Sequence, residues 1–223
     1  ASCLVGSEMC IRDRINDAVG IDVNETANYI QATTSGFGNS GGGSVEKIDT
    51  YGSISFALRK SFMPGPSFFV GFSPSNLDAD ASSIKYSFKI EGQFVSGSYA
   101  LKVTPYKNGI AFEDSFTCHG ADEFRISRVA YPSGAKILWH RYRPSTNLIS
   151  TIAQEDDESG DTLEPLHLDF AFSMKGQSIF DVKMTPCEGV DTDVEDKACQ
   201  GIVNLGVADY MRVEQEICCY TAG

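Results

Sequence analysis

The chain has 223 residues, of which 22% are charged and 42% hydrophobic, an ordinary balance for a globular protein. Asp and Glu number 30 against 18 Lys and Arg, which gives a formal charge of −12. Such a surface repels phosphate backbones, so we expect no nucleic-acid partner. The sequence holds no run of about 18 apolar residues, so we also expect no membrane insertion.

The first residues are set apart from the rest. Residues 2–14 resemble the translated sequencing-adapter read-through that occurs at the ends of assembled environmental sequences. We therefore exclude residues 1–14 from fold reasoning and expect a metagenomic fragment whose biological chain begins upstream. On this interpretation the chain is covalently part of a larger multidomain protein.

Short alternating segments follow one another from residue 51 onward. In residues 51–58 the apolar Ile54, Phe56 and Leu58 share one face, as expected of a half-buried strand. The pair Asn108-Gly109 indicates a tight hairpin, because both turn positions need positive φ. The segment Gly41–Gly43 is interpreted as a turn. The same alternation recurs in residues 84–90, 99–103, 124–129, 136–143, 166–172 and 180–184.

This pattern predicts an all-β fold, a two-sheet antiparallel sandwich over residues 15–186. Two acidic stretches interrupt it. Residues 155–161 are interpreted as a solvated loop, and residues 188–196 as either a solvated linker or a calcium site. No other cofactor is expected. Residues 187–223 are compositionally distinct, and we expect a linker or the start of a further module there.

Cysteine usage bears on the compartment. Neither a CxxC pair nor zinc-finger spacing is present. Cys187 and Cys199 bracket an acidic loop that a disulfide would close. Extracellular disulfides and free buried thiols both remain open as interpretations. Outside the excluded segment the cysteines are Cys118, Cys187, Cys199, Cys218 and Cys219.

The order of features over about three quarters of the chain resembles concanavalin A-like lectin and glucanase modules of surface and tail-fibre-like proteins. The resemblance implies a jelly roll of two sheets whose concave face often binds sugars. The acidic loop at 155–161 and the cysteine-bearing tail depart from the usual pattern. The segments that carry the resemblance are residues 34–41, 50–56, 69–73, 84–90, 103–109, 120–126 and 136–141.

Catalytic motifs are weak. Retaining glucanases of this family carry Glu-x-Asp-x-Glu on one strand, which places the carboxylates on one face, and the sequence has no such run. His167 and Asp169 would share a strand face, either as a hydrogen-bonded surface pair or as a catalytic or metal site. We therefore expect no enzyme, with a divergent glycoside hydrolase kept as an alternative.

Sugar binding needs an exposed aromatic ring for stacking and polar groups for the hydroxyls. Trp139 is the only tryptophan. It is either a stacking platform, with Leu138 facing inward, or a core residue. Tyr106 and Asn108 of the predicted hairpin are further candidates. The full set of candidate ligand-binding residues is Trp139, Arg141, Tyr106, Asn108, His167 and Asp169.

These observations predict a non-catalytic carbohydrate-binding or adhesion module of a larger extracellular, cell-surface or virion-surface protein. Its expected partner is a glycan or polysaccharide. The alternative from another class is a ligand-free structural spacer domain, as in repetitive adhesin stalks.

Overall fold

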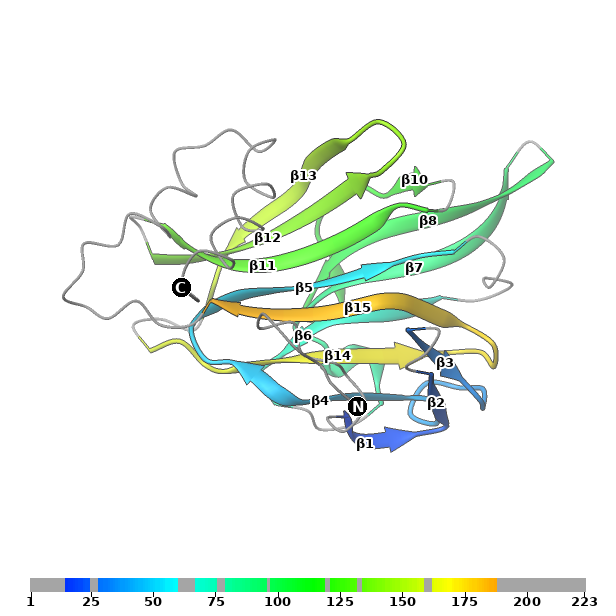
Figure 1. Cartoon of the computed structure of the whole chain (residues 1–223), viewed down its shortest axis with the longest axis horizontal. Helices are drawn as coiled ribbons and strands as arrows, with labels where there is room; N and C mark the ends of the chain where they lie inside the picture. The colour runs from blue at the N-terminus through cyan, green and yellow to red at the C-terminus, as the bar shows by residue number, and fades with distance from the viewer. Residues whose placement is uncertain are drawn as a thin grey trace.

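Two antiparallel β-sheets pack face to face in the computed structural model (Figure 1). The structure describes residues 15–24, 28–59, 67–75, 79–95, 97–118, 121–131, 134–158 and 162–187. The first described strand begins at Ile15 and the last ends at Cys187. Residues 1–14 and 188–223 lie outside the described part.

Sheet A has eight strands. Seven follow one another across the sheet, and the short β9 (Ile110–Ala111) pairs with β8 off this path. The order is β1 (Ile15–Val19), β4 (Gly41–Ile48), β14 (Leu166–Phe172), β6 (Phe68–Ser73), β7 (Tyr86–Val95), β8 (Ser98–Lys107) and β10 (Phe116–Cys118).

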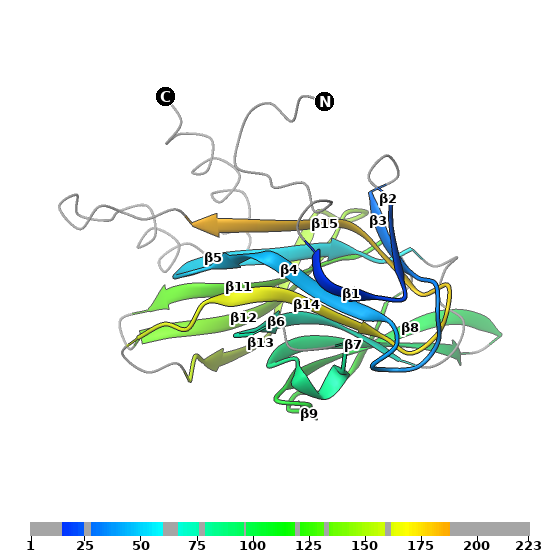
Figure 2. The ribbon, with the colours of Figure 1, turned by 90° about the horizontal axis from the view of Figure 1, so that it is seen from below.

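Sheet B has seven strands, and all its pairings are antiparallel. Figure 2 shows the molecule from below, with β15 and β9 on opposite sides of the view. The order is β13 (Leu148–Asp156), β12 (Gly134–Arg143), β11 (Glu123–Tyr131), β5 (Tyr51–Ala57), β15 (Ser178–Cys187), β3 (Tyr29–Ala32) and β2 (Ile21–Asn24).

The core between the sheets follows from the alternation along each strand. In β7, Tyr86, Phe88 and Ile90 are fully buried in the main hydrophobic cluster. Aromatic rings from both sheets meet there: Phe124 lies 5.7 Å from Phe56 and 5.3 Å from Phe88, centroid to centroid. These contacts confirm the predicted all-β sandwich, in which the apolar face of each sheet is buried against the other.

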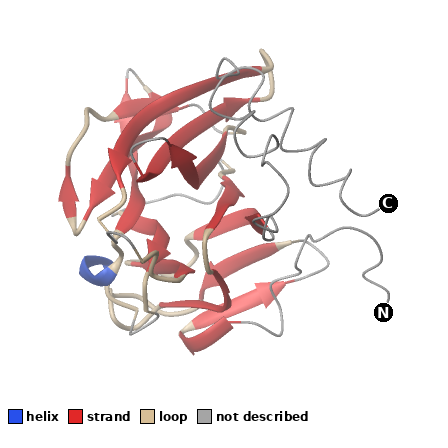
Figure 3. Cartoon of the chain, turned by 90° about the vertical axis from the view of Figure 1, so that its left-hand side faces the viewer, coloured by secondary structure: helices blue, strands red, loops and turns tan. Residues whose placement is uncertain are grey.

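A second, smaller apolar cluster lies on the outer face of sheet A. Phe69, Ile84 and Ala171 form it, separately from the main core, and Tyr106 packs against it. The connection from β6 to β7 contains a 3₁₀ turn, Ala81–Ser83, drawn in blue in Figure 3. Part of this outer face is therefore covered by the chain itself.

The structure confirms the predicted hairpin and corrects one predicted turn. Asn108 and Gly109 have φ of 51° and 74°, and Lys107 pairs with Ile110 across them. Gly41 does not lie in a turn, because it begins strand β4 and pairs with Ala171. A Cβ at Gly41 would lie 2.5 Å from the carbonyl oxygen of Phe170, so the close approach of β14 explains the glycine.

None of the described segments is a helix long and apolar enough to cross a bilayer.

Candidate functional site

Trp139 is a core residue, which corrects the stacking-platform interpretation and agrees with its alternative. Its side chain has no exposed surface, and its Nε1 donates a hydrogen bond to the carbonyl of Ser87, 3.0 Å away. The ring contacts Phe112 at 4.9 Å and Tyr86 at 5.9 Å. Leu138, the neighbour that the platform interpretation turned inward, lies in a separate small cluster. Trp139 therefore joins the two sheets and is closed to a ligand.

Arg141 shares the inward face of β12 with Trp139, as the alternation predicts, but this face is the core. Its Nε donates to the carboxylate of Asp122 at 2.7 Å, and both side chains are largely buried. The guanidinium also lies over the ring of Phe116. Arg141 is thus held by Asp122 and Phe116, and its role in ligand binding stays a prediction.

His167 and Asp169 lie on the same outer face of β14, as predicted, but other parts of the chain already contact both side chains. Asp169 is fully buried and accepts a hydrogen bond from Ser73 Oγ at 2.6 Å. Ser73 Oγ also lies 3.2 Å from the carbonyl of Ser83, in the 3₁₀ turn. His167 Nδ1 lies 2.9 Å from the carbonyl of Ser44, so this nitrogen carries the proton. Asp169 is therefore covered and His167 only half exposed.

Tyr106 and Asn108 lie together at the β8–β9 hairpin, where side chains reach solvent. Tyr106 is half-buried, and the edge-on ring of Phe69 supports it at 5.3 Å. Lys89 Nζ lies 5.7 Å from the centre of the Tyr106 ring. Asn108 is exposed at the turn, and its backbone N–H donates to the carbonyl of Lys85 at 2.7 Å.

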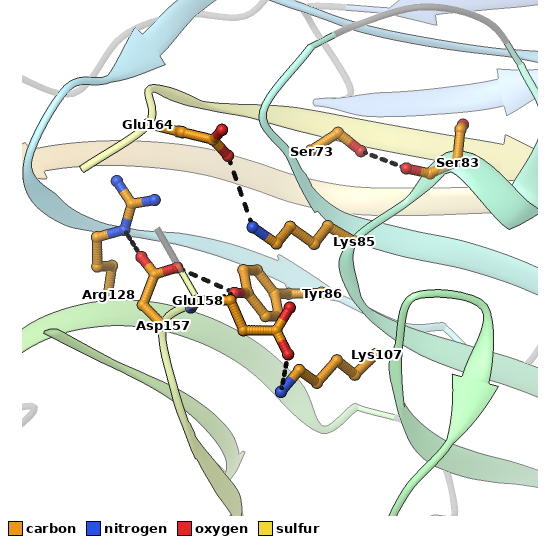
Figure 4. A network of polar contacts seen from close by, with 9 residues as sticks. All are labelled: Ser73, Ser83, Lys85, Tyr86, Lys107, Arg128, Asp157, Glu158 and Glu164. Carbon is orange, nitrogen blue, oxygen red and sulfur yellow. Dashed lines mark hydrogen bonds and ion pairs between the residues drawn. The ribbon is translucent and has the colours of Figure 1, made fainter. Parts of the chain in front are cut away.

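Sequence reasoning missed the acidic residues that contact this hairpin. Lys107 Nζ lies 2.8 Å from Glu158, which follows β13 (Figure 4). It also lies 3.7 Å from Glu155, within β13. The Lys107 hydrogen bond holds the pKa of Glu158 below its ordinary value, and a hydrogen bond from the Asn108 side chain acts in the same direction. The signal in the sequence was charge complementarity between Lys107, at the predicted hairpin, and the acidic stretch at residues 155–161. We call Lys89, Tyr106, Lys107, Asn108 and Glu158 the hairpin site.

The acidic stretch is also anchored in the protein interior, which corrects the solvated-loop interpretation. Asp157 has no exposed side-chain surface and pairs with Arg128 Nε at 2.7 Å. Its other oxygen accepts a hydrogen bond from the Tyr86 hydroxyl at 3.0 Å (Figure 4). Burial and the neighbouring Asp157 charge raise the pKa of Tyr86 above its ordinary value. The buried triad therefore fixes the position of Glu158 beside the hairpin.

The carboxylates near Lys107 are poorly suited to hydrolysis. Glu155 and Glu158 converge on one ammonium group, that of Lys107. A general acid in a glycosidase needs a raised pKa, whereas that of Glu158 is lowered. Across the described residues, no three His, Cys, Asp or Glu side chains gather closely enough to hold a metal ion.

The remaining sequence predictions fall elsewhere. Arg125 pairs with His140 across β11 and β12 in sheet B. The predicted calcium site at 188–196 and the cysteines Cys199, Cys218 and Cys219 lie outside the described residues, and the side chain of Cys187 is not described. The thiol of Cys118 is buried in the core.

The fold matches solved lectins. Peanut lectin, solved with a nine-residue peptide, has a TM-score of 0.50 at 11% identity over 81% of this chain and 96% of its own. The lectin from Bauhinia forficata, in complex with GalNAc, has a TM-score of 0.50 at 9% identity over the same shares. No protein-family model and no curated protein sequence matches the chain. The fold is therefore the concanavalin A-like jelly roll that the sequence resembled.

Proposed function

We propose that the chain is a non-catalytic carbohydrate-binding module and that the glycan binds at the hairpin site. The observation that carries the proposal is the half-buried Tyr106 ring, which packs on Phe69, lies beside Lys89 Nζ and precedes the exposed Asn108 by two residues. Sugar-binding sites in proteins combine an aromatic ring that has a solvent-exposed face with neighbouring hydrogen-bonding groups.

The polar groups of the hairpin site are held in place before any ligand arrives. Lys107 is fixed by Glu158, and Asn108 is fixed at its backbone by Lys85. Lys89 pairs with Glu91 at 2.9 Å. Side chains that are already ordered lose little entropy on binding, which favours recognition of hydroxyl groups by weak individual contacts.

The lysines near the hairpin are paired with carboxylates. Each of the three lysines named above contacts a carboxylate, and Lys85 lies 3.6 Å from Glu164. The chain as a whole carries a formal charge of −12. Because such a surface repels anions, a neutral glycan suits the hairpin site better than a sulfated or uronic-acid chain.

The lectin neighbours support this proposal only through the shared fold, since their sequence identity is low. We propose further that the module acts outside the cell, on a cell or virion surface, as part of a larger multidomain adhesive chain. The cysteine-rich segment after residue 186 supports an oxidising compartment. Mass mapping of Cys187, Cys199, Cys218 and Cys219 with and without a reductant tests this placement.

A glycan array probed with the fluorescently labelled full chain tests the function itself. The proposal predicts saturable binding to at least one neutral glycan, with no release of reducing ends during prolonged incubation. Binding to no glycan would favour the ligand-free spacer domain. Release of reducing ends from the bound glycan would favour the glycoside hydrolase.

A further inference from the structure

The turn of the β8–β9 hairpin consists of the dipeptide Asn108-Gly109, and both residues are exposed. We propose that Asn108 is a self-modification site, at which spontaneous deamidation releases the hairpin from Glu158. The consequence for ligand binding rests on the proposed function, whereas the modification and the release do not.

The reaction needs only solvent water and a solvent base. The base removes the proton from the backbone nitrogen of Gly109, which attacks Cγ of Asn108. The new C–N bond closes a five-membered succinimide, and the bond from Cγ to the side-chain nitrogen breaks, so that ammonia leaves. Water then opens the ring at either carbonyl. One product is aspartate, and the other is isoaspartate, in which the main chain runs through the former side chain.

The structure favours this reaction at Asn108 over the chain's other asparagines in left-handed conformations. Gly109 has no Cβ to screen its nitrogen, and the nearest heavy atoms to a Cβ built there are 3.7 Å away. Asn28 and Asn147 also have positive φ, of 47° and 50°. They are followed by Tyr29 and Leu148, whose side chains obstruct approach to the following nitrogen.

Asn28 and Asn147 are therefore matched internal controls for the same backbone conformation. The Asn28 amide donates to Asp181 at 3.1 Å, and the Asn147 amide oxygen accepts from the Tyr142 hydroxyl at 3.0 Å. Each control differs from Asn108 in the residue that follows it and in the partner of its side-chain amide.

Deamidation replaces a favourable contact between the hairpin and Glu158 with an unfavourable one. Asn108 directly follows Lys107, whose Nζ lies 2.8 Å from the Glu158 carboxylate, and the Asn108 side chain acts with Lys107 to lower the pKa of Glu158. An aspartate at position 108 places one carboxylate against another, which costs stability. An isoaspartate adds a main-chain atom to a two-residue turn whose conformation sets the pairing of Lys107 with Ile110. Tyr106, the preceding residue of β8, then loses its fixed position.

The test follows the full chain through prolonged incubation in mildly alkaline buffer. Peptide mass spectrometry measures exchange of the side-chain –NH2 for –OH at each asparagine, and hydrogen exchange measures protection of residues 106–111. We expect Asn108 to convert well before Asn28 and Asn147, and protection of the hairpin to fall as it converts. Freshly prepared Asn108→Asp is expected to lose the same protection, whereas the control Asn147→Asp keeps it.

Two results would overturn the inference. If Asn108 keeps its amide as long as Asn147 does, the site is not self-modifying. If the hydrogen-exchange protection of the hairpin is unchanged in both the aged protein and Asn108→Asp, the proposed release from Glu158 is contradicted. An array probed with fresh and aged protein adds a separate arm. Loss of binding with age supports the inference, and unchanged binding by fully converted protein opposes it. Absence of binding by fresh protein counts against the proposed function alone. Peptide mass spectrometry still tests the modification, and hydrogen exchange still tests the release of the hairpin.

Discussion

Arg128 and Asp157 form a fully buried ion pair, with Nε and Oδ2 separated by 2.7 Å. Arg128 comes from β11 in sheet B, and its Nη1 also donates to the carbonyl of Thr50. Asp157 follows β13 and reaches the Tyr86 hydroxyl of sheet A. The pair thus links the two sheets at the end of the sandwich where the hairpin site lies.

Asp157→Asn leaves the Arg128 guanidinium buried without its counter-charge. We expect a loss of about 3–5 kcal/mol in the free energy of unfolding, because a buried charge stripped of its partner keeps its desolvation penalty. Urea unfolding of the full chain measures this loss. The matched control is Asp156→Asn, one residue earlier, whose 3.4 Å pair with Lys136 is exposed and is expected to contribute less than about 1 kcal/mol. Equal effects of the two substitutions would contradict the buried pair.

Trp139→Ala is expected to remove about 3–5 kcal/mol from the free energy of unfolding, because it empties a large site in the core. Trp139→Phe keeps an aromatic ring and loses the hydrogen bond to Ser87, so its loss is expected to be smaller, at about 1–3 kcal/mol. Chemical denaturation of both variants ranks them. A Trp139→Ala protein as stable as the parent would place the ring at the surface.

His140 gives the protein a pH-dependent stability. Burial, and then the charge of Arg125, lower its pKa to about 3 from 6.5. In the unfolded chain His140 takes up a proton below about pH 6.5, whereas in the folded protein it takes up that proton only near pH 3. The free energy of unfolding therefore falls with decreasing pH across this window, by up to about 1.4 kcal/mol per unit.

The window between pH 6.5 and about 5 isolates this effect, because carboxylates titrate mostly below it. Denaturation at several pH values should show a steeper slope for the parent than for His140→Asn, which has no titrating ring. The substitution is expected to lower stability at neutral pH as well, since His140 Nδ1 lies 3.3 Å from Thr151 Oγ1. Identical slopes would show that His140 does not titrate abnormally.

Several strands were predictable because a strand with one buried face alternates apolar and polar residues. The stripes of β5, β7, β11, β12 and β14 identify those strands, and Asn108-Gly109 identifies the turn. Strand β13 was not predicted, because it lies at the edge of sheet B and most of its residues are exposed or half-exposed. An edge strand without a buried stripe carries little periodic signal.

The site was harder to predict than the fold. Alternation places Leu138 and Trp139 on opposite faces of the strand but does not show which of them faces the other sheet. The hydrogen bond of Trp139 to Ser87, which is distant in the sequence, determines this. Asp169 looked accessible because nothing local in β14 reveals that the β6–β7 connection covers it. Asp157 looked solvated because its partner Arg128 lies far away in the sequence.

The proposed function depends most directly on Tyr106 as the residue that stacks on the glycan. Isothermal titration of the parent, Tyr106→Ala and Tyr142→Ala with the best neutral glycan from the array measures its contribution. Tyr142 is the control, since it is also half-buried but hydrogen-bonds Asn147 on sheet B. The proposed function predicts binding weakened about tenfold or more, roughly 1.4 kcal/mol, for Tyr106→Ala alone, with both variants folded. Undiminished affinity of a folded Tyr106→Ala protein would contradict it.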